Sequence, residues 1–478
     1  MPRDPNTNDP EPGFEQITAR EHGLQRRLSA SRMTMIAIGG AIGTGLFLGS
    51  GAAIGLAGPA VLVSYGIGAL IALLLMGCLA EMTIAHPTSG SFGDYAEYYI
   101  GPLAGFLVRY AYWTCIVLAV GTEVTAVALY MHYWFAGVPG WLWILAFSAL
   151  LILINARSVN VFGAVEYWFS AIKITAIVIF ILLASFFVWR ACGSTAGAAG
   201  TPQGIGLRNY TAYGGFFPHG LWGAWVAVIV AIFSYLSIEM IAVAAGEASE
   251  PQVAVRRAFR ATVVRLILFY LVTLALVLAV MPWTALGAAE SPFVRVMREL
   301  AVPGAAGIFN FVILVAALSA MNSQLYITTR MMFSLARAGQ APRRFGVLSS
   351  RGVPVQALLL SSFGIALAAV VSVVAPEGAY LSMLSISAFG AMFTWMMIFV
   401  THYFFRRARG GAAPAAFRMG GFPATTLLGA ALMAAVLATT AFTEAFRKTL
   451  AFGVPFIALL CLIYGYRSAR AASSGRGA

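Results

Sequence analysis

The chain has 478 residues, of which 60% are hydrophobic and 10% are charged, whereas soluble globular proteins average about 25% charged residues. Apolar segments of about 20 residues recur along its whole length, and each is long enough to cross a bilayer. The formal net charge of +13 raises nucleic-acid binding as a possibility, but most of the basic residues gather on one side of the predicted spans, as membrane topogenesis requires. We therefore expect an all-α polytopic membrane protein without a nucleic-acid partner.

Residues 1–32 are predicted to form a polar, cytoplasmic N-terminal tail. They contain proline and acidic residues but lack the basic start, short apolar core and small-residue cleavage site of a signal peptide. The positive-inside rule places the arginine-rich side in the cytoplasm, and with it both termini, in the cell inner (plasma) membrane. The basic residues expected on the outer side are Arg190, Arg208, Arg295, Arg298, Arg447 and Lys448.

Hydropathy predicts about twelve transmembrane helices. In chain order they are Met33–Leu56, Pro59–Ala80, Leu103–Tyr133, Trp141–Asn155, Val161–Trp189, Trp222–Ala245, Ala261–Trp283, Ala305–Ala336, Val355–Val374, Tyr380–Phe405, Ala424–Thr440 and Leu450–Tyr466. We expect residues 33–405 to form a ten-helix transport core and residues 406–466 to add two accessory helices. Residues 467–478 are expected to form a cytoplasmic tail.

Three segments between the spans have distinctive compositions. Pro87–Ile100 is too polar to cross a bilayer, and we expect a short helix at the inner interface, capped by Ser89 or Ser91. Ala191–His219 is rich in small and hydroxyl residues and is predicted to be the longest external loop. Glu247–Arg260 mixes acidic and basic residues, which favours a cytoplasmic linker helix.

Two of the spans contain residues that interrupt a helix. The run GGAIGTG at residues 39–45 places four glycines in seven positions, and each interior glycine costs a helix roughly 0.5–1 kcal/mol relative to alanine. A second interruption, FSYLSIE, occupies residues 233–239. Unwound backbone in a membrane is tolerated only beside a cavity or a bound polar ligand. Breaks in the first and sixth spans therefore predict a five-plus-five inverted repeat with a transport site near the bilayer midplane.

These runs and several others resemble the bacterial amino acid permeases of the amino acid–polyamine–organocation (APC) superfamily. The matching runs are GGAIGTGLF at 39–47, AGP at 57–59, PTSGSF at 87–92, GTEVTA at 121–126, FSYLSIE at 233–239, AGE at 245–247, EP at 250–251, NS at 322–323 and TRM at 329–331. The resemblance extends from about Leu24 to Tyr466. It implies a LeuT-like fold of twelve helices with broken helices 1 and 6, and uptake of an α-amino acid or a close analogue, usually driven by protons.

The first break is the predicted site for the carboxylate of the substrate. A half-helix N-terminus carries about half a positive charge and unpaired N–H groups, both of which favour an anion. The resemblance implies that Ile42, Thr44 and Gly45 bind the carboxylate and that the carbonyl of Ala41 binds the amino group. The alternative for Gly43 and its neighbours is close helix packing through small residues.

The second break supplies the remaining predicted substrate contacts, at Phe233, Ser234 and Leu236. Backbone carbonyl groups freed by unwinding can hold the ammonium group of the substrate. Phe233 matches the aromatic residue that closes over the substrate in the resembling family, although a buried phenylalanine without that match is more often plain core.

Three ionisable residues inside the spans are predicted to couple transport to protons: Lys173, Glu123 and Glu239. Charged groups at this depth are energetically costly, which makes them functional candidates. Lys173 lies too deep for easy snorkelling, and a lysine that faces the first break could take the place of a sodium ion, as the resemblance implies. The alternatives are structural: Glu123 could pair with Lys173 or another buried polar group, and Glu239 could be a protonated carboxyl bonded to a neighbouring helix.

Other polar residues within the spans receive weaker assignments. We expect Glu166 near the inner interface and Arg330 to be a topological or inner-gate charge. A further set shares one face of the eighth span and could either line a cavity or join helices. Its members are Ser319, Asn322, Ser323 and Tyr326.

The sequence offers no support for an enzyme. The four cysteines and five histidines are scattered, without the spacing of a metal site or a disulfide framework, and no phosphate-binding GxxxxGK[ST] run occurs. We therefore expect neither a metal nor a cofactor, and only an amino acid, protons and the lipid bilayer as partners. A proton symporter, an amino acid exchanger and a substrate sensor stay open as alternatives, as do the substrate and the oligomeric state.

Overall fold

The structure is a computed structural model that describes residues 14–21, 42–157, 159–193, 204–246, 250–287, 290–374, 379–409 and 417–474. Within these residues the regular structure is entirely helical. Seven of the described helices are long and apolar enough to cross a membrane, and shorter apolar helices accompany them. The chain is thus a multi-pass, all-α membrane protein, as the sequence predicts.

The N-terminal half contains a sharp turn between its first two described membrane helices. Gly45–Ala85 is an apolar run of 41 residues, roughly 60 Å long if straight, which is too long for one crossing. The run turns at Gly58, whose φ of 60° is readily adopted by glycine, and Pro59 follows. The elements of this half are α1 (Phe14–Thr18), η1 (Ala19–Glu21), η2 (Gly45–Gly49), α3 (Ser50–Ala57), η3 (Gly58–Ala60), α4 (Val61–Ala85), α5 (Ser91–Tyr99), α6 (Pro102–His132), α7 (Gly140–Arg157) and α8 (Val159–Gly193).

The described part of the C-terminal half begins at residue 204. Its elements are η4 (Leu207–Tyr210), α9 (Gly220–Ser234), α10 (Met240–Ala245), α11 (Pro251–Arg265), η5 (Leu266–Val272), α12 (Thr273–Val280), η6 (Trp283–Ala285), α13 (Pro292–Glu299), α14 (Ala305–Arg337), η7 (Arg343–Gly346), α15 (Val355–Ser361), α16 (Phe363–Val374), α17 (Ala379–Ala408), α18 (Ala424–Thr439), η8 (Glu444–Phe446) and α19 (Arg447–Ser474). The predicted linker helix is not separate from the seventh span, because α11, η5 and α12 follow one another without a gap.

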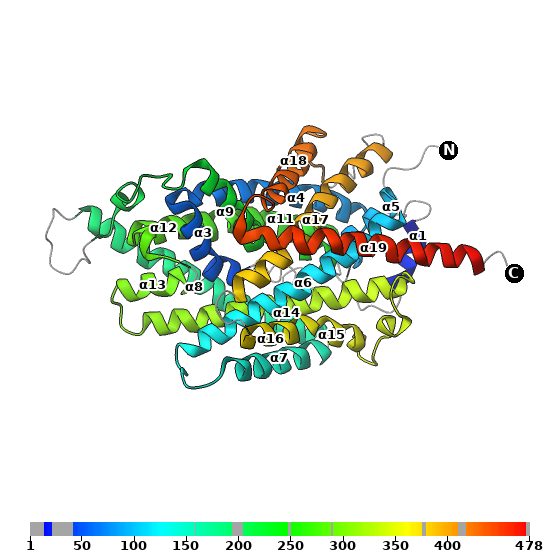
Figure 1. The fold of residues 1–478 in the computed structure, drawn as a ribbon, viewed down its shortest axis with the longest axis horizontal. Helices are drawn as coiled ribbons and strands as arrows, with labels where there is room; N and C mark the ends of the chain where they lie inside the picture. Colours follow the sequence, from blue (N-terminus) through cyan, green and yellow to red (C-terminus); the bar gives the residue numbers. More distant parts are fainter. Residues whose placement is uncertain are drawn as a thin grey trace.

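Helices in equivalent places of the two halves pack against each other. The helix after the first break, α3, packs against α9 of the broken sixth span, and α6 packs along α14. The two long helices α6 and α14 run along the long axis of the molecule, and α18 and α19 pack against α17 (Figure 1). Figure 1 also shows α1 and the end of α19 at the same end of the molecule.

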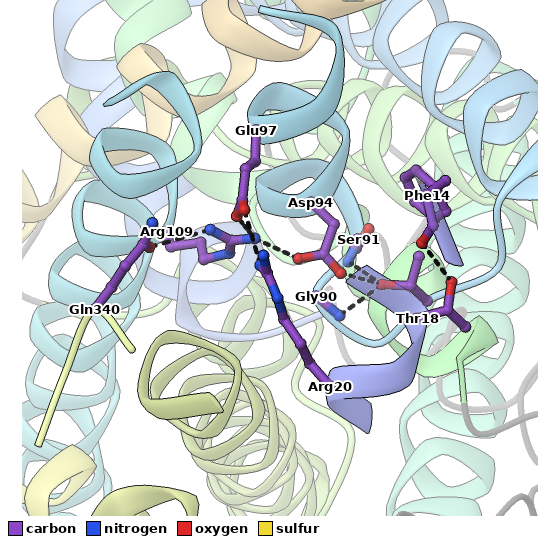
Figure 2. Close-up of polar contacts among 10 residues, drawn as sticks. Phe14, Thr18, Arg20, Gly90, Ser91, Asp94, Glu97, Arg109 and Gln340 are labelled. Carbon is purple, nitrogen blue, oxygen red and sulfur yellow. Dashed lines mark hydrogen bonds and ion pairs between the residues drawn. The ribbon is translucent and has the colours of Figure 1, made fainter. Parts of the chain in front are cut away.

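At that end, charged side chains join the N-terminal segment to the helices α5 and α6 (Figure 2). Arg109 of α6 contacts the carboxylates of Asp94 and Glu97, at 2.7 Å from the latter. Arg20 of η1 forms a second ion pair with Glu97, at 2.8 Å. The ring of Phe14 stacks on His86 with a centroid separation of 4.1 Å. Residues 14–21 are therefore packed onto the helical core by an aromatic contact and a charge network.

The cap of α5 differs from the prediction. The helix begins at Ser91, but neither Ser89 nor Ser91 forms a side-chain cap. Instead, Thr88 Oγ1 accepts the backbone N–H groups of Gly90 and Ser91, at 3.0 and 3.2 Å, and donates to Asp94. Most of α5 is buried, because Asp94 and Glu97 face Arg109 instead of water.

This ion network carries a stability prediction. We expect Arg109→Met to lower the free energy of unfolding by about 3–5 kcal/mol, because it leaves Asp94 and Glu97 without a buried cationic partner. Thermal unfolding of the purified protein in detergent would measure the loss. Arg257→Met, the same change at an exposed position of α11, is the control. An unchanged melting temperature in Arg109→Met would contradict the prediction.

The same network predicts a response to acid. Burial by itself would raise the pKa of Glu97, but Arg109 and Arg20 outweigh burial and hold this pKa below its usual value. The contribution of Glu97 to stability is therefore fully present above the unfolded pKa of about 4.3 and is lost as the pH falls through the lower, folded pKa. We expect Glu97→Gln to be less stable than the parent at neutral pH and to lose less stability below about pH 4.

Candidate functional site

The described part of the first break is non-helical where the sequence predicts it. Ile42 and Gly43 precede the helix, which starts at Thr44 and continues as one turn of π-helix over Gly45–Gly49. Residues 22–41 lie outside the described residues, so the predicted contact of the Ala41 carbonyl with a substrate stays a prediction.

The second break separates α9 from α10. The helix α9 ends at Ser234, and α10 starts at Met240. Within the turn between them, Ser237 has a φ of 75°, a left-handed conformation that is unfavourable for a residue with a side chain. The sixth span is thus broken at the predicted residues.

The two breaks touch through their backbones. A Cβ atom added to Gly45 would lie 2.6 Å from the Cα atom of Ser234, and one added to Gly43 would lie 2.6 Å from Glu123 Oε1 and 2.8 Å from the Cβ atom of Ala320. The hydroxyl of Ser234 donates to the carbonyl oxygen of Gly45 at 2.8 Å. Glycine at positions 43 and 45 therefore allows a close approach that a larger residue would prevent.

A small cavity lies between the breaks and the helices α6 and α14. We call it the central cavity, and its lining residues are Gly43, Gly45, Glu123, Phe233, Ser234, Leu236, Ala320 and Gln324. Five of the eight predicted substrate contacts are in this set. Its free space admits about one water molecule, so the cavity is too small in this conformation for a larger ligand.

Glu123 faces the first break directly. Its Oε2 atom accepts the backbone N–H of Thr44 at 3.0 Å, and only 3% of the residue is exposed. The carboxylate therefore lies at the N-terminus of the helix that starts at Thr44, where the macrodipole and free N–H groups favour an anion. This is the place that the resemblance implies for the carboxylate of the substrate.

Lys173 also faces the first break, from the middle of α8. Its Nζ atom donates to the carbonyl oxygen of Ile42 at 3.1 Å and to Ser319 Oγ of α14 at 2.7 Å. The residue is fully buried. The side chain therefore links the unwound backbone of the first break to α14, although its predicted part in proton coupling remains a prediction.

Glu166, which the sequence places near the inner end of its span, is fully buried within the protein and shares the hydroxyl of Ser319 with Lys173. Ser319 Oγ donates to Glu166 Oε1 at 2.5 Å, and Asn322 Nδ2 donates to Glu166 Oε2 at 3.2 Å. The distance of Glu166 from the span end gives no information on which helix its side chain faces. Glu166 and Lys173 are seven residues apart, which places both on one face of a helix and could have revealed the pair.

The polar face of the eighth span mainly joins helices. Ser319 and Asn322 contact residues of α8, and Asn155 of α7 donates to Asn322 Oδ1 at 2.8 Å. The ring of Tyr326 stacks on Phe162 at a centroid distance of 4.4 Å, and the guanidinium group of Arg330 lies 4.7 Å from the centroid of the same tyrosine ring. The residues of α14 that line the central cavity are instead Ala320 and Gln324. Gln324 was not identified from the sequence as a candidate site residue.

Glu239 lies behind the second break and outside the lining of the central cavity. Its Oε1 atom accepts the hydroxyl of Tyr112 at 2.7 Å and the backbone N–H of Ser237 at 3.1 Å. Its Oε2 atom accepts the indole N–H of Trp395 at 3.2 Å. The carboxyl group of Glu239 therefore joins the left-handed turn at Ser237 to Tyr112 of α6 and Trp395 of α17. A part for Glu239 in proton coupling remains a prediction.

Comparisons with known proteins agree with this architecture. The sequence pattern of the family described as amino acid permease matches residues 32–468. The γ-aminobutyric acid permease of Bacillus subtilis (strain 168) is 39% identical over 432 residues, which cover 90% of this chain and 91% of that protein. A putative histidine permease of the same organism is 38% identical over 93% of this chain and 94% of its own length. The aromatic amino acid transport protein AroP of Salmonella typhimurium (strain SL1344) is 38% identical over 82% of this chain and 85% of its own length. With broken helices that meet at a buried cavity and a match over nearly its whole length, the chain belongs to the amino acid permease family.

Proposed function

We propose that this permease imports an amino acid by proton symport, with the substrate bound between the two breaks and exposed alternately to the two sides of the membrane. The observation that carries the proposal is the contact between Lys173 Nζ and the carbonyl oxygen of Ile42. It joins an ionisable group in the middle of a span to the backbone that is expected to hold the substrate.

The proposed binding mode uses the backbone at both breaks. The carboxylate of the substrate is held by the N–H groups at Thr44 and Gly45. In this conformation the N–H of Thr44 donates to Glu123 instead. The ammonium group lies against carbonyl groups at the second break, and Phe233 covers the bound molecule. Because the central cavity is water-sized, substrate entry requires the broken helices to move away from α6 and α14.

Protonation of Lys173 couples this movement to the proton gradient in the proposal. A protonated Lys173 donates to the Ile42 carbonyl and holds the first break against α8 and α14. When the proton leaves, the positive charge is lost, and the contact between the break and the lysine weakens. Ser319 Oγ bridges Lys173 and Glu166. In the proposal, the buried carboxyl group of Glu166 is the partner with which Lys173 exchanges its proton through this hydroxyl.

The proposed orientation puts both termini in the cytoplasm of the cell, with the protein in the inner (plasma) membrane. The support is the excess of arginine on one side of the spans and the position of α1 and the end of α19 at one end of the molecule (Figure 1). The network of Arg109, Asp94, Glu97 and Arg20 would then lie at the inner face of the transporter.

Uptake into proteoliposomes tests the proposal. Purified protein in sodium-free vesicles would be offered labelled amino acids, including γ-aminobutyric acid, histidine and aromatic amino acids, because those substrates are named for its relatives. We expect one class to accumulate under an inward proton gradient and the accumulation to collapse with a protonophore. Uptake that occurs only into vesicles preloaded with amino acid would replace symport by exchange.

A further inference from the structure

The lining of the central cavity includes a polar side chain that belongs to neither break. Gln324 of α14 lines the cavity and is only 3% exposed. Among the residues that the structure describes, no group donates a hydrogen bond to its side-chain oxygen Oε1. Its neighbours in the lining are mostly apolar or lack a side chain, including Gly43, Leu236 and Ala320.

An unpaired amide in such a place is energetically unfavourable unless a ligand or water satisfies it. Leaving a buried polar group without a partner costs about 1–3 kcal/mol. The cavity has room for about one water molecule, and such a water can hydrogen-bond to the amide when no substrate is bound. A substrate that displaces the water must supply a polar group of its own or leave the amide unpaired.

The position of Gln324 decides which part of a substrate it meets. The two breaks offer unwound backbone, which suits the carboxylate and ammonium groups that all α-amino acids share. The opposite wall, from α6 and α14, offers only the side chains of Glu123, Ala320 and Gln324. The variable side chain of the substrate therefore points toward this wall. Glu123 already contacts the first break, which leaves Gln324 as the neutral hydrogen-bonding group on that wall.

We propose that Gln324 hydrogen-bonds to the side chain of the substrate and thereby selects amino acids with a hydroxyl or carboxamide side chain over apolar ones of the same shape. The inference rests on the proposed transport function and adds the substrate class. A glutamine amide offers both a donor and an acceptor, so it fits either type of side chain. Sites built to bond a polar substrate group discriminate strongly against an analogue that lacks it, because their own polar group is then left unpaired.

The experiment compares substrates of equal shape. Threonine and valine are nearly isosteric, as are asparagine and leucine, so each pair isolates the polar group. Affinity is measured in the purified full-length protein by ligand-induced thermal stabilisation, and again by competition with uptake in proteoliposomes. We expect the parent protein to prefer the polar member of a pair by about 10- to 100-fold. Gln324→Leu and Gln324→Met should bring that ratio close to one while affinity for the apolar member stays the same or rises.

Gln356→Leu, the same substitution at an exposed position of α15, should keep the preference of the parent. An unchanged ratio in both Gln324 variants, or an equal loss of affinity for both members of each pair, would overturn the inference and leave Gln324 as a structural amide. A parent protein that binds both members equally would overturn it as well. Because thermal stabilisation measures binding without transport, selective binding in a protein that fails to accumulate substrate would reject the transport proposal and keep this one.

Discussion

Lys173→Ala is expected to abolish accumulation of the substrate against its gradient while leaving exchange between preloaded vesicles and the medium. The substitution removes the side chain that donates to the Ile42 carbonyl oxygen, at 3.1 Å, and with it the proposed proton site beside the first break. The cavity-lining residues Gly43, Gly45 and Phe233, which are the proposed substrate contacts, are left intact. Uptake of the labelled substrate with and without an inward proton gradient measures the effect, and exchange in the same preparation shows that the variant is folded.

The second lysine of the chain provides the matched control. Lys448 lies at an exposed position and donates to Ser382 Oγ at 3.0 Å, so Lys448→Ala should accumulate substrate as the parent does. Glu166→Gln keeps the acceptor for Ser319 but removes the carboxylate near Lys173. We expect it to shift the pH dependence of uptake and to retain exchange. Accumulation against a gradient in Lys173→Ala would show that the lysine does not couple transport to protons.

Gly43→Leu is expected to weaken substrate binding by about 10- to 100-fold, since overpacking a filled site costs about 1–3 kcal/mol. Even a single Cβ atom at this position would lie 2.6 Å from Glu123 Oε1 and 2.8 Å from the Cβ atom of Ala320. A leucine would therefore fill the central cavity and push the first break away from α6 and α14. The dissociation constant, measured by ligand-induced thermal stabilisation, is the direct readout.

The control for this prediction is Gly55→Leu in α3. Gly55 is exposed, and a Cβ atom added there meets nothing within 4 Å, so binding should not change. If Gly43→Leu binds its substrate with the affinity of the parent protein, the glycine serves helix packing instead of the binding site. A smaller loss in Gly43→Ala than in Gly43→Leu is expected, because the side chain of Glu123 can move slightly while the backbone stays in place.

The membrane spans and the second break could be predicted from the sequence because they depend on local properties. A span is recognised from the length and hydropathy of a continuous segment, and the predicted span Val161–Trp189 lies within the observed α8, Val159–Gly193. The interruption at residues 233–239 was visible because polar residues occur inside an apolar segment. The observed turn lies between Ser234 and Met240, as that pattern predicts.

The direction in which a buried polar side chain points could not be predicted in the same way. Glu166 was expected near the interface, yet it contacts Ser319 and Asn322 of a helix about 150 residues further along the chain. Glu239 was predicted from its depth alone, and the structure places it behind the break, against Tyr112 and Trp395. The depth of a residue in the membrane follows from its position within a span, whereas the partner that its side chain contacts depends on how three or four helices pack together.

The sequence by itself therefore determined that this is a helical membrane protein with interrupted first and sixth spans, since hydropathy and helix-breaking residues act over short stretches of chain. Only the tertiary structure decided which groups meet at the central cavity. Glu123 reaches Thr44, Lys173 reaches Ile42, and Gln324 faces the space between the breaks because α6, α8 and α14 pack around them. Such contacts join residues far apart in the chain, and no local pattern encodes the rotation of one helix against another.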